Sequence, residues 1–182
     1  MNLAETCRHV GELTKWTLSD IELRARLLRE AGIMPKGGYG RHAPDINPED
    51  AAKLLIGLAV SAKAAHCPES VTSYSPMKPI DAFMAAPTFG EALSRILADH
   101  AYKLKVKRVI ICKLWREASI EWTSGGKLKR ATYRAEDLPK TGYGFAVRED
   151  TTFSGGFLHQ LAIDLAEDDD AMGAILAENA DK

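Results

Sequence analysis

Basic side chains gather in two stretches of this chain of 182 residues, although its formal net charge is −1. Residues 24–41 contain five Lys or Arg and one acidic side chain, and residues 103–134 contain ten Lys or Arg and two acidic side chains. The segment from residue 164 to residue 181 is acidic instead. Cations at this density are typical of a surface that binds phosphate and equally of a solvated face, so charge alone does not decide between the two.

The histidines and cysteines give no indication of a catalytic or metal centre. Neither Cys7 with His9 nor Cys67 with His66 has a second pair at the spacing of a zinc site. No nucleophile–base set, pair of carboxylates or cofactor motif stands out. We therefore expect no enzyme, no bound metal and no cofactor, and we expect the three cysteines to be reduced thiols.

The overall composition is that of a globular protein, with 46% hydrophobic and 27% charged residues. No run of about 18 uncharged apolar residues is present, which is the minimum for a membrane-spanning helix. The first 30 residues include Glu5, Glu12 and Asp20 and lack the apolar segment of a secretory signal. We therefore expect a cytoplasmic protein with no membrane partner.

Two N-terminal helices would position the first basic stretch. Residues 4–15 predict a helix with Val10 and Leu13 among its inward side chains. The residues from Ser19 to Glu22 match a capping box, which starts a second helix. Two helices separated by about three residues form a candidate helix-turn-helix.

The second of these helices is amphipathic. At 100° per residue its apolar side chains share one broad arc, Arg26 and Arg29 lie on the opposite side, and Arg24 lies at the edge of the arc. Gly32 is placed to end the helix in the left-handed conformation.

A glycine-rich segment follows, and a further helix comes after it. Residues 36–44 contain three glycines and end in a proline, so we expect a flexible hairpin or wing there. The segment lacks the Lys-Ser/Thr ending of a nucleotide-binding loop. Asn47 is expected to cap the next helix, which is apolar on nearly every side over residues 51–65. Such a helix must be covered all round, by the second part of the chain or by a partner subunit.

The middle of the chain predicts a division into domains. Residues 67–87 hold four prolines and several serines and threonines, which favours a linker. The residues from Thr88 to Glu91 match a second capping box, opening a helix to about Lys103. We therefore expect a DNA-binding domain over residues 1–66, a linker over 67–87, a dimerisation or partner-binding domain over 88–166, and an acidic tail over 167–182.

The second part of the chain predicts β-structure. Alternation over residues 109–123 indicates one long strand, or two strands joined by a bulge near Arg116, with the even-numbered side chains on the core face. The residues from Ser124 to Lys127 are typical of a hairpin turn, after which the chain returns to Arg134. Residues 143–147 predict another strand. The expected fold is α+β, a small antiparallel sheet with helices on one side.

Three short segments in the first 50 residues share the pattern of a known DNA-binding module. Residues 10–15 contain a Gly-Glu-Leu core, residues 26–35 end in Gly-Ile-Met-Pro, and residues 46–50 open a helix. In these features the chain resembles the MerR family of transcription regulators. The family's paired tyrosines are Leu27 and Leu28 here, and no long coiled-coil helix or cysteine-rich loop follows, so its dimerisation and metal sensing are not carried over. The resemblance implies a winged helix-turn-helix similar to those of phage regulators and excisionases.

The resemblance also implies which side chains would contact DNA. In such modules the recognition helix enters the major groove, where the base edges are distinguishable. The side chains placed there or beside it are Lys15, Arg24, Arg26, Arg29, Lys36, Tyr39, Arg41 and His42. A possible second basic surface surrounds the predicted hairpin and consists of Lys127, Lys129, Arg130 and Arg134.

We therefore expect a sequence-specific regulator of transcription, of phage or mobile-element type, that binds double-stranded DNA as a homodimer. Its second part would dimerise or bind a protein partner. The alternative is a protein-interaction module, such as a phage-type inhibitor or adaptor, that uses the winged helix to bind a protein. The apolar helix and the acidic end of the chain favour this alternative.

Overall fold

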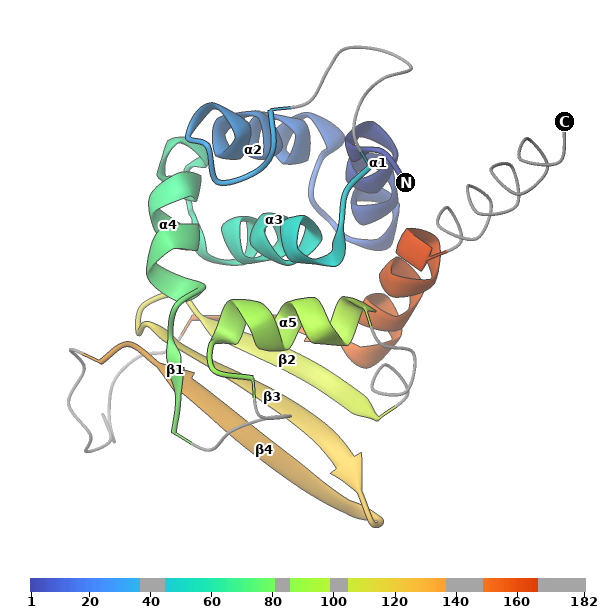
Figure 1. The fold of residues 1–182 in the computed structure, drawn as a ribbon, viewed down its shortest axis with the longest axis vertical. Coiled ribbons are helices and arrows are strands. Elements are labelled where there is room, and N and C mark those ends of the chain that lie inside the picture. Colours follow the sequence, from blue (N-terminus) through green and yellow to red (C-terminus); the bar gives the residue numbers. More distant parts are fainter. Residues whose placement is uncertain (37–44, 81–85, 99–104, 137–148, 167–182) are drawn as a thin grey trace, which may run out of the picture.

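The computed structural model describes residues 1–36, 45–80, 86–98, 105–136 and 149–166. In these residues the strands form one antiparallel sheet in the order β1-β4-β3-β2-β5, of which Figure 1 labels β1 to β4. The strands are β1 (Lys78–Pro79), β2 (Val106–Cys112), β3 (Glu117–Ser124), β4 (Lys127–Arg134) and β5 (Asp150–Ser154). The predicted α+β class is therefore confirmed.

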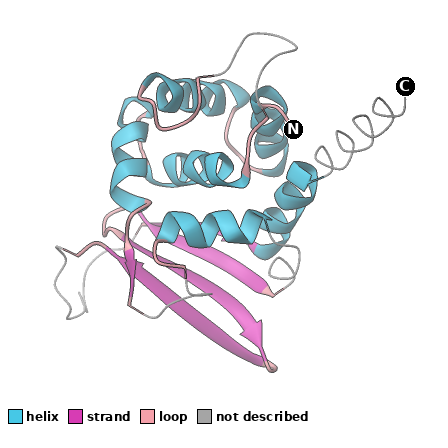
Figure 2. Ribbon diagram, in the orientation of Figure 1, coloured by secondary structure: helices cyan, strands magenta, loops and turns pink. Residues whose placement is uncertain are grey.

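The helices lie on one face of this sheet (Figure 2). They are α1 (Leu3–Leu13), α2 (Leu18–Glu30), α3 (Pro48–Val60), α4 (Cys67–Tyr74) and α5 (Phe89–Ala98), with a short η2 (Ala64–His66) and a helical stretch over residues 155–166. Helix α5 lies next to the sheet, and α3 lies between α5 and the pair formed by α1 and α2 (Figure 1). Helix α3 contacts α2, α4, α5 and β2. This central position is what its sequence predicts, because a helix that is apolar on nearly every side must be covered all round.

Side-chain caps set the starts of the helices. The Asn47 side chain accepts the backbone N–H of Asp50 at 2.8 Å, and Thr88 accepts that of Glu91 at 3.2 Å, as predicted. The start of α2 differs from the prediction. Its cap is Thr17, whose hydroxyl accepts the N–H of Asp20, and Ser19 lies inside the helix.

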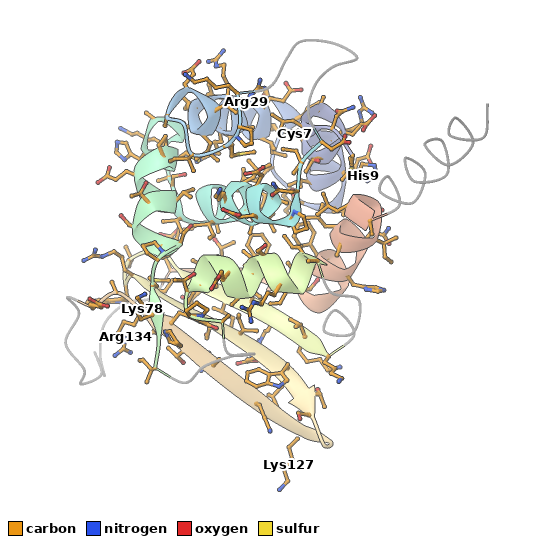
Figure 3. The ribbon with its side chains drawn as sticks, viewed as in Figure 1. Cys7, His9, Arg29, Lys78, Lys127 and Arg134 are labelled. Atoms are coloured by element: carbon orange, nitrogen blue, oxygen red, sulfur yellow. The ribbon has the colours of Figure 1, made fainter. Side chains whose placement is uncertain are left out.

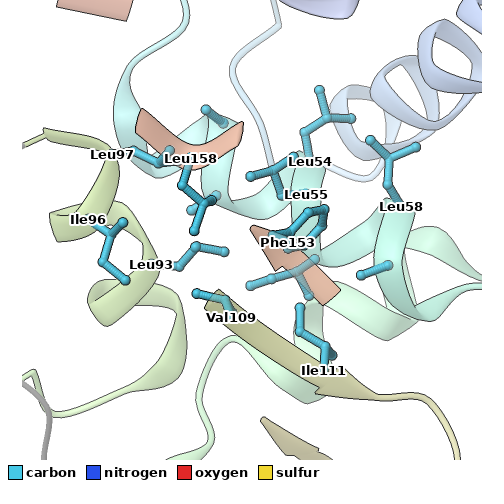
Figure 4. Packing of buried hydrophobic residues seen from close by; sticks show 14 of the residues in the cluster. Leu54, Leu55, Leu58, Leu93, Ile96, Leu97, Val109, Ile111, Phe153 and Leu158 are labelled. Atoms are coloured by element: carbon cyan, nitrogen blue, oxygen red, sulfur yellow. The ribbon is translucent and has the colours of Figure 1, made fainter. Parts of the chain in front are cut away.

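One hydrophobic cluster runs through both predicted parts of the chain. It joins Val10 and Leu28 of the N-terminal helices to side chains of α3, α5 and the sheet. Figure 4 shows its centre, where leucines of α3 meet α5, β2 and β5, and the labelled members are Leu54, Leu55, Leu58, Leu93, Ile96, Leu97, Val109, Ile111, Phe153 and Leu158. The division into separately folding domains stays a prediction.

The predicted linker is corrected by the structure. Its first residues form α4, with Pro68 in the first turn, where a missing backbone N–H costs nothing. Val71 and Tyr74 are buried, and the Tyr74 hydroxyl donates to the carbonyl of Cys112 at 2.8 Å. Pro79 lies in β1, an edge strand, which tolerates proline. The prolines therefore mark the boundaries of packed elements.

The alternation predicted for residues 109–123 holds only in part. The chain forms two strands, β2 and β3, connected by a turn over residues 113–116. Val109 and Ile111 face the helices with Ala118 and Ile120, so the inward parity changes across the turn. Leu114, predicted on the core face, lies in the turn and is exposed. The turn lacks glycine and proline, which is why the sequence pattern does not reveal it.

Glycines hold two turns as the sequence predicts. Gly125 and Gly126 have φ of 58° and 73° between β3 and β4, which matches the mirror-image turn that two-residue hairpins prefer. Gly32 ends α2 with φ of 72°. The strand predicted at residues 143–147 and the end of the helix predicted to reach Lys103 lie outside the described residues.

Candidate nucleic-acid interface

Among the described residues, positive charge is concentrated at one end of the sheet. We call it the distal end: residues 105–108 at the start of β2 and residues 121–130 around the β3–β4 turn. It contains six cations and one carboxylate, namely Lys105, Lys107, Arg108, Lys127, Lys129, Arg130 and Glu121. In Figure 1 the β3–β4 hairpin extends past α5 at this end, and in Figure 3 the Lys127 side chain points away from the protein.

Strand pairing builds a charged row across the distal end. Arg108, Glu121 and Arg130 are opposite one another in β2, β3 and β4. The Arg108 Nε atom lies 2.6 Å from one Glu121 oxygen, and the Arg130 Nε atom lies 3.4 Å from the other. Glu121 is only 6% exposed, whereas both arginine side chains are more than half exposed. One carboxylate therefore orients two guanidinium groups whose remaining N–H groups are available to an anion.

The lysines of the distal end come from the turn and from an irregularity in β2. The β2–β3 register shifts between Val106 and Arg108, so Lys107 lies at a bulge. Lys105 comes immediately before β2. Its carbonyl accepts the N–H of Thr123 at 2.8 Å, which holds Lys105 beside β3. Lys105, Lys107, Lys127 and Lys129 are all exposed.

Arg134 does not belong to the distal end, although the sequence analysis grouped it with Lys127, Lys129 and Arg130. It lies at the opposite end of β4, paired with Lys78 of β1, and its guanidinium contacts Glu117 (Figure 3). At about 3.3 Å per residue its Cα lies about 23 Å from that of Lys127. Three of the four predicted residues are therefore brought together, and Lys105, Lys107 and Arg108 join them from β2.

The face of α2 predicted to contact DNA has mixed charge. Its exposed residues include Glu22, Arg26 and Glu30, and the Arg26 Nε atom lies 3.6 Å from Glu30. Arg29 is half-buried and, with Cys7, lines a cavity of about 380 Å³ between α1 and α2 (Figure 3). This face therefore carries a smaller excess of positive charge than the distal end.

Two groups near this face are internal. Burial, with the nearby Glu22 carboxylate, raises the pKa of the Cys7 thiol to about 12, so it stays protonated at neutral pH. Arg24, predicted to bind DNA, is 6% exposed. It donates to the Ser61 carbonyl at 2.9 Å, to the Ser61 hydroxyl and to the Asp20 carboxylate at 3.0 Å. The prediction for Arg24 is wrong because the guanidinium holds the end of α3 against α2.

The other predicted DNA contacts are only partly accounted for. Lys15, in the turn between α1 and α2, and Lys36, after α2, are exposed. Tyr39, Arg41 and His42, on the predicted wing, lie outside the described residues. Helices α1 and α2 contact each other, and the winged helix-turn-helix, including its wing, stays a prediction.

Other features of the described residues bear on chemistry. His9 Nδ1 lies 3.2 Å from the Asp164 carboxylate and joins α1 to the helical residues 155–166 (Figure 3). In the described residues, no three His, Cys, Asp or Glu side chains converge in a way that could hold a metal ion. Among the helices of the same part of the chain, none combines the length and apolarity needed to cross a bilayer.

No protein-family model matches the chain, and the searches of curated proteins and of solved structures found no match either. The geometry of the site is therefore the basis for assigning a function.

Proposed function

We propose that the protein binds double-stranded DNA and that the distal end of the sheet is its main contact with the phosphate backbone. The observation that carries this proposal is the ratio of six cations to one carboxylate at the distal end. Its arginines are oriented by Glu121, and its lysines are exposed. Lys and Arg at such a density release counterions from DNA, which is the main source of sequence-independent affinity.

The shape of the distal end also suits a DNA groove. Neighbouring strands lie about 4.8 Å apart, so β3 and β4 form a two-stranded ribbon with its strand axes about 5 Å apart. The major groove of B-form DNA, about 12 Å wide, admits a two-stranded ribbon. The β3–β4 hairpin extends beyond α5, so the helices do not stand between it and a duplex (Figure 1). In this proposal the hairpin takes the role that the sequence analysis gave to α2, and transcription regulation remains the proposed biological role.

Reversing the charge of the two lysines beside the turn is expected to weaken DNA binding. In Lys127→Glu/Lys129→Glu, each substitution removes one phosphate contact and adds a repulsive charge. We expect a 10- to 100-fold rise in Kd for a fluorescein-labelled duplex of mixed sequence, measured by anisotropy at several salt concentrations. The slope of log Kd against log salt should fall by about 2 in magnitude.

The matched control reverses two exposed lysines away from the distal end, in Lys63→Glu/Lys78→Glu. It changes the net charge by the same amount and should raise Kd less than about threefold, through the long-range field alone. Equal effects in the two double variants would show that only net charge matters and would contradict the proposed contact. Absence of any salt-dependent binding by the unmodified protein would rule out the function itself.

A further inference from the structure

The lysines of the β3–β4 hairpin lie on the face of the sheet that carries the helices. Residues directly opposite one another in neighbouring strands project from the same face, and the two faces alternate along each strand. Lys129 is opposite Trp122, whose side chain packs against the hydrophobic cluster. Lys127 is two residues away on β4 and therefore shares this face. We call it the lysine face.

The other face of the hairpin carries arginine. Arg108, Glu121 and Arg130 are opposite one another, and each is one residue out of step with the core side chains of its strand. None of the described helices lies on this face, which we call the arginine face (Figure 2). Both arginine side chains are more than half exposed there. The hairpin therefore presents lysine and arginine to different surroundings.

Glu121 determines how the arginines are oriented. The nitrogen of each guanidinium that lies nearest the carboxylate is Nε, at 2.6 Å for Arg108 and 3.4 Å for Arg130. The two Nη groups of each guanidinium form a planar fork of N–H donors. In the major groove guanine presents two acceptors, O6 and N7, that match such a fork, and this pairing is the commonest specific contact of arginine with DNA.

The depth of the major groove separates the two faces of the hairpin. The groove is about 8.5 Å deep, with the base edges at its floor and the phosphates along its rims. A ribbon that lies flat in the groove turns one face to the base edges, and long side chains on its other face reach toward the rims. A duplex on the lysine face would share that side of the sheet with the helices (Figure 2). The arginine face is therefore the one that fits against the base edges.

We propose that Arg108 and Arg130 recognise guanine in the major groove, and that Glu121 is the positioning residue that orients their guanidinium groups. This inference rests on the proposed DNA binding and names the base that the distal end prefers. The lysine face supplies the part of the affinity that does not depend on sequence, through the phosphates. The arginine face supplies the preference for duplexes that contain guanine.

Replacing guanine by 7-deazaguanine in the DNA tests this preference. The modified base pairs with cytosine as guanine does, but it has carbon in place of N7, and the duplex keeps every phosphate. Two fluorescein-labelled duplexes of one sequence, with guanine or with 7-deazaguanine at every guanine position, are compared by anisotropy with the full chain. We expect Kd to be at least about fivefold higher for the modified duplex, the lower end of the discrimination that an arginine–guanine pair provides. The salt dependence should be the same for both.

Variants that keep the charge separate the arginine fork from simple attraction. Arg108→Lys/Arg130→Lys retains two cations but loses both forks, so the Kd values for the two duplexes should become nearly equal while the salt slope is retained. Lys127→Glu/Lys129→Glu is the matched control. It should weaken binding to both duplexes by the same factor and leave the preference for guanine intact.

Glu121→Gln tests the positioning role. The variant removes a negative charge from beside the DNA, so affinity for the 7-deazaguanine duplex should rise, whereas the preference for guanine should fall because the arginines lose their anionic partner. A merely structural defect would instead lower the affinity for both duplexes. A preference unchanged in Glu121→Gln would overturn the positioning role.

The failure of this inference differs from the failure of the proposed function. Equal, salt-dependent affinity of the unmodified protein for the two duplexes would overturn guanine recognition and leave DNA binding standing. A preference for guanine that survives in Arg108→Lys/Arg130→Lys would also overturn it, because the preference would not come from the arginine forks. Absence of salt-dependent binding to either duplex would rule out both the inference and DNA binding.

Discussion

Replacing Leu55 by alanine is expected to lower the free energy of unfolding by about 4 kcal/mol. Leu55 is fully buried in α3, at the point where this helix meets the sheet side of the core (Figure 4). The substitution removes three buried carbons and leaves a cavity lined by both α3 and its neighbours. Rigid elements surround the site, so the cavity can collapse only in part, and the loss should lie toward the upper part of the range for such changes.

The same variant tests whether the two predicted parts unfold together. Because one hydrophobic cluster includes α1 to α5 and the sheet, we expect urea transitions followed by circular dichroism and by tryptophan fluorescence to coincide and to shift together. Leu128→Ala is the matched control, since Leu128 is 64% exposed on the hairpin, and should change the free energy by less than about 0.5 kcal/mol. Two separate transitions, of which only one responds to the Leu55 substitution, would contradict a shared core.

Arg24→Ala is expected to lower the free energy of unfolding by about 3 kcal/mol. The substitution leaves the Ser61 carbonyl at the end of α3 without its donor and removes the ion pair with Asp20. Hydrogen bonds from charged donors to buried acceptors are among the stronger ones in proteins, and an acceptor left buried and unpaired retains its full desolvation cost. DNA affinity should be nearly unchanged under conditions where the variant is folded.

Arg26→Ala is the control for this prediction, because Arg26 lies on the same helix, is exposed and pairs with Glu30 in an exposed i, i+4 contact. Such pairs contribute about 0.3–0.5 kcal/mol, so the loss should be small. Both variants are measured by urea denaturation at neutral pH. If Arg24→Ala is as stable as Arg26→Ala but binds DNA more weakly, Arg24 acts in binding and our structural role for it is wrong.

Features encoded by neighbouring residues could be predicted from the sequence. The cap at Asn47, the cap at Thr88 and the Gly125–Gly126 turn depend on side chains and backbone freedom within a few residues of each other. The all-round apolar pattern of α3 likewise predicts a central helix wherever its neighbours come from. Signals of this kind do not depend on the rest of the fold.

Features that depend on distant residues could not be predicted. Arg24 lies at the edge of an apolar arc, and only the approach of Ser61, 37 residues away in the chain, turns it into a buried donor. The prolines of residues 67–87 are typical of a linker, but their effect depends on whether each stands at a helix start or an edge strand. Leu13, predicted among the inward side chains of the first helix, is 41% exposed, because the helical pattern alone does not say which side chains the rest of the chain covers.

For the same reason, only half of the cations of the candidate site could be predicted from the sequence. Lys127, Lys129 and Arg130 are close together in sequence and could be grouped. Their neighbours in β2 join them only once the turn at residues 113–116 and the β2–β3 register are known. The excess of cations over residues 103–134 indicated all the cations of the distal end together. It also included Arg134, which lies at the other end of β4 and does not belong to the site.

Lysine acetylation footprinting tests the central proposal most directly, because it reads every lysine of the folded protein at once. The protein is treated with a limiting amount of acetylating reagent, with and without duplex DNA, and modification is quantified by mass spectrometry. The account predicts that DNA protects Lys105, Lys107, Lys127 and Lys129 and leaves Lys36, Lys63 and Lys78 unchanged. Protection of Lys15 and Lys36 with none at Lys127 and Lys129 would contradict it and would favour the α2 face instead.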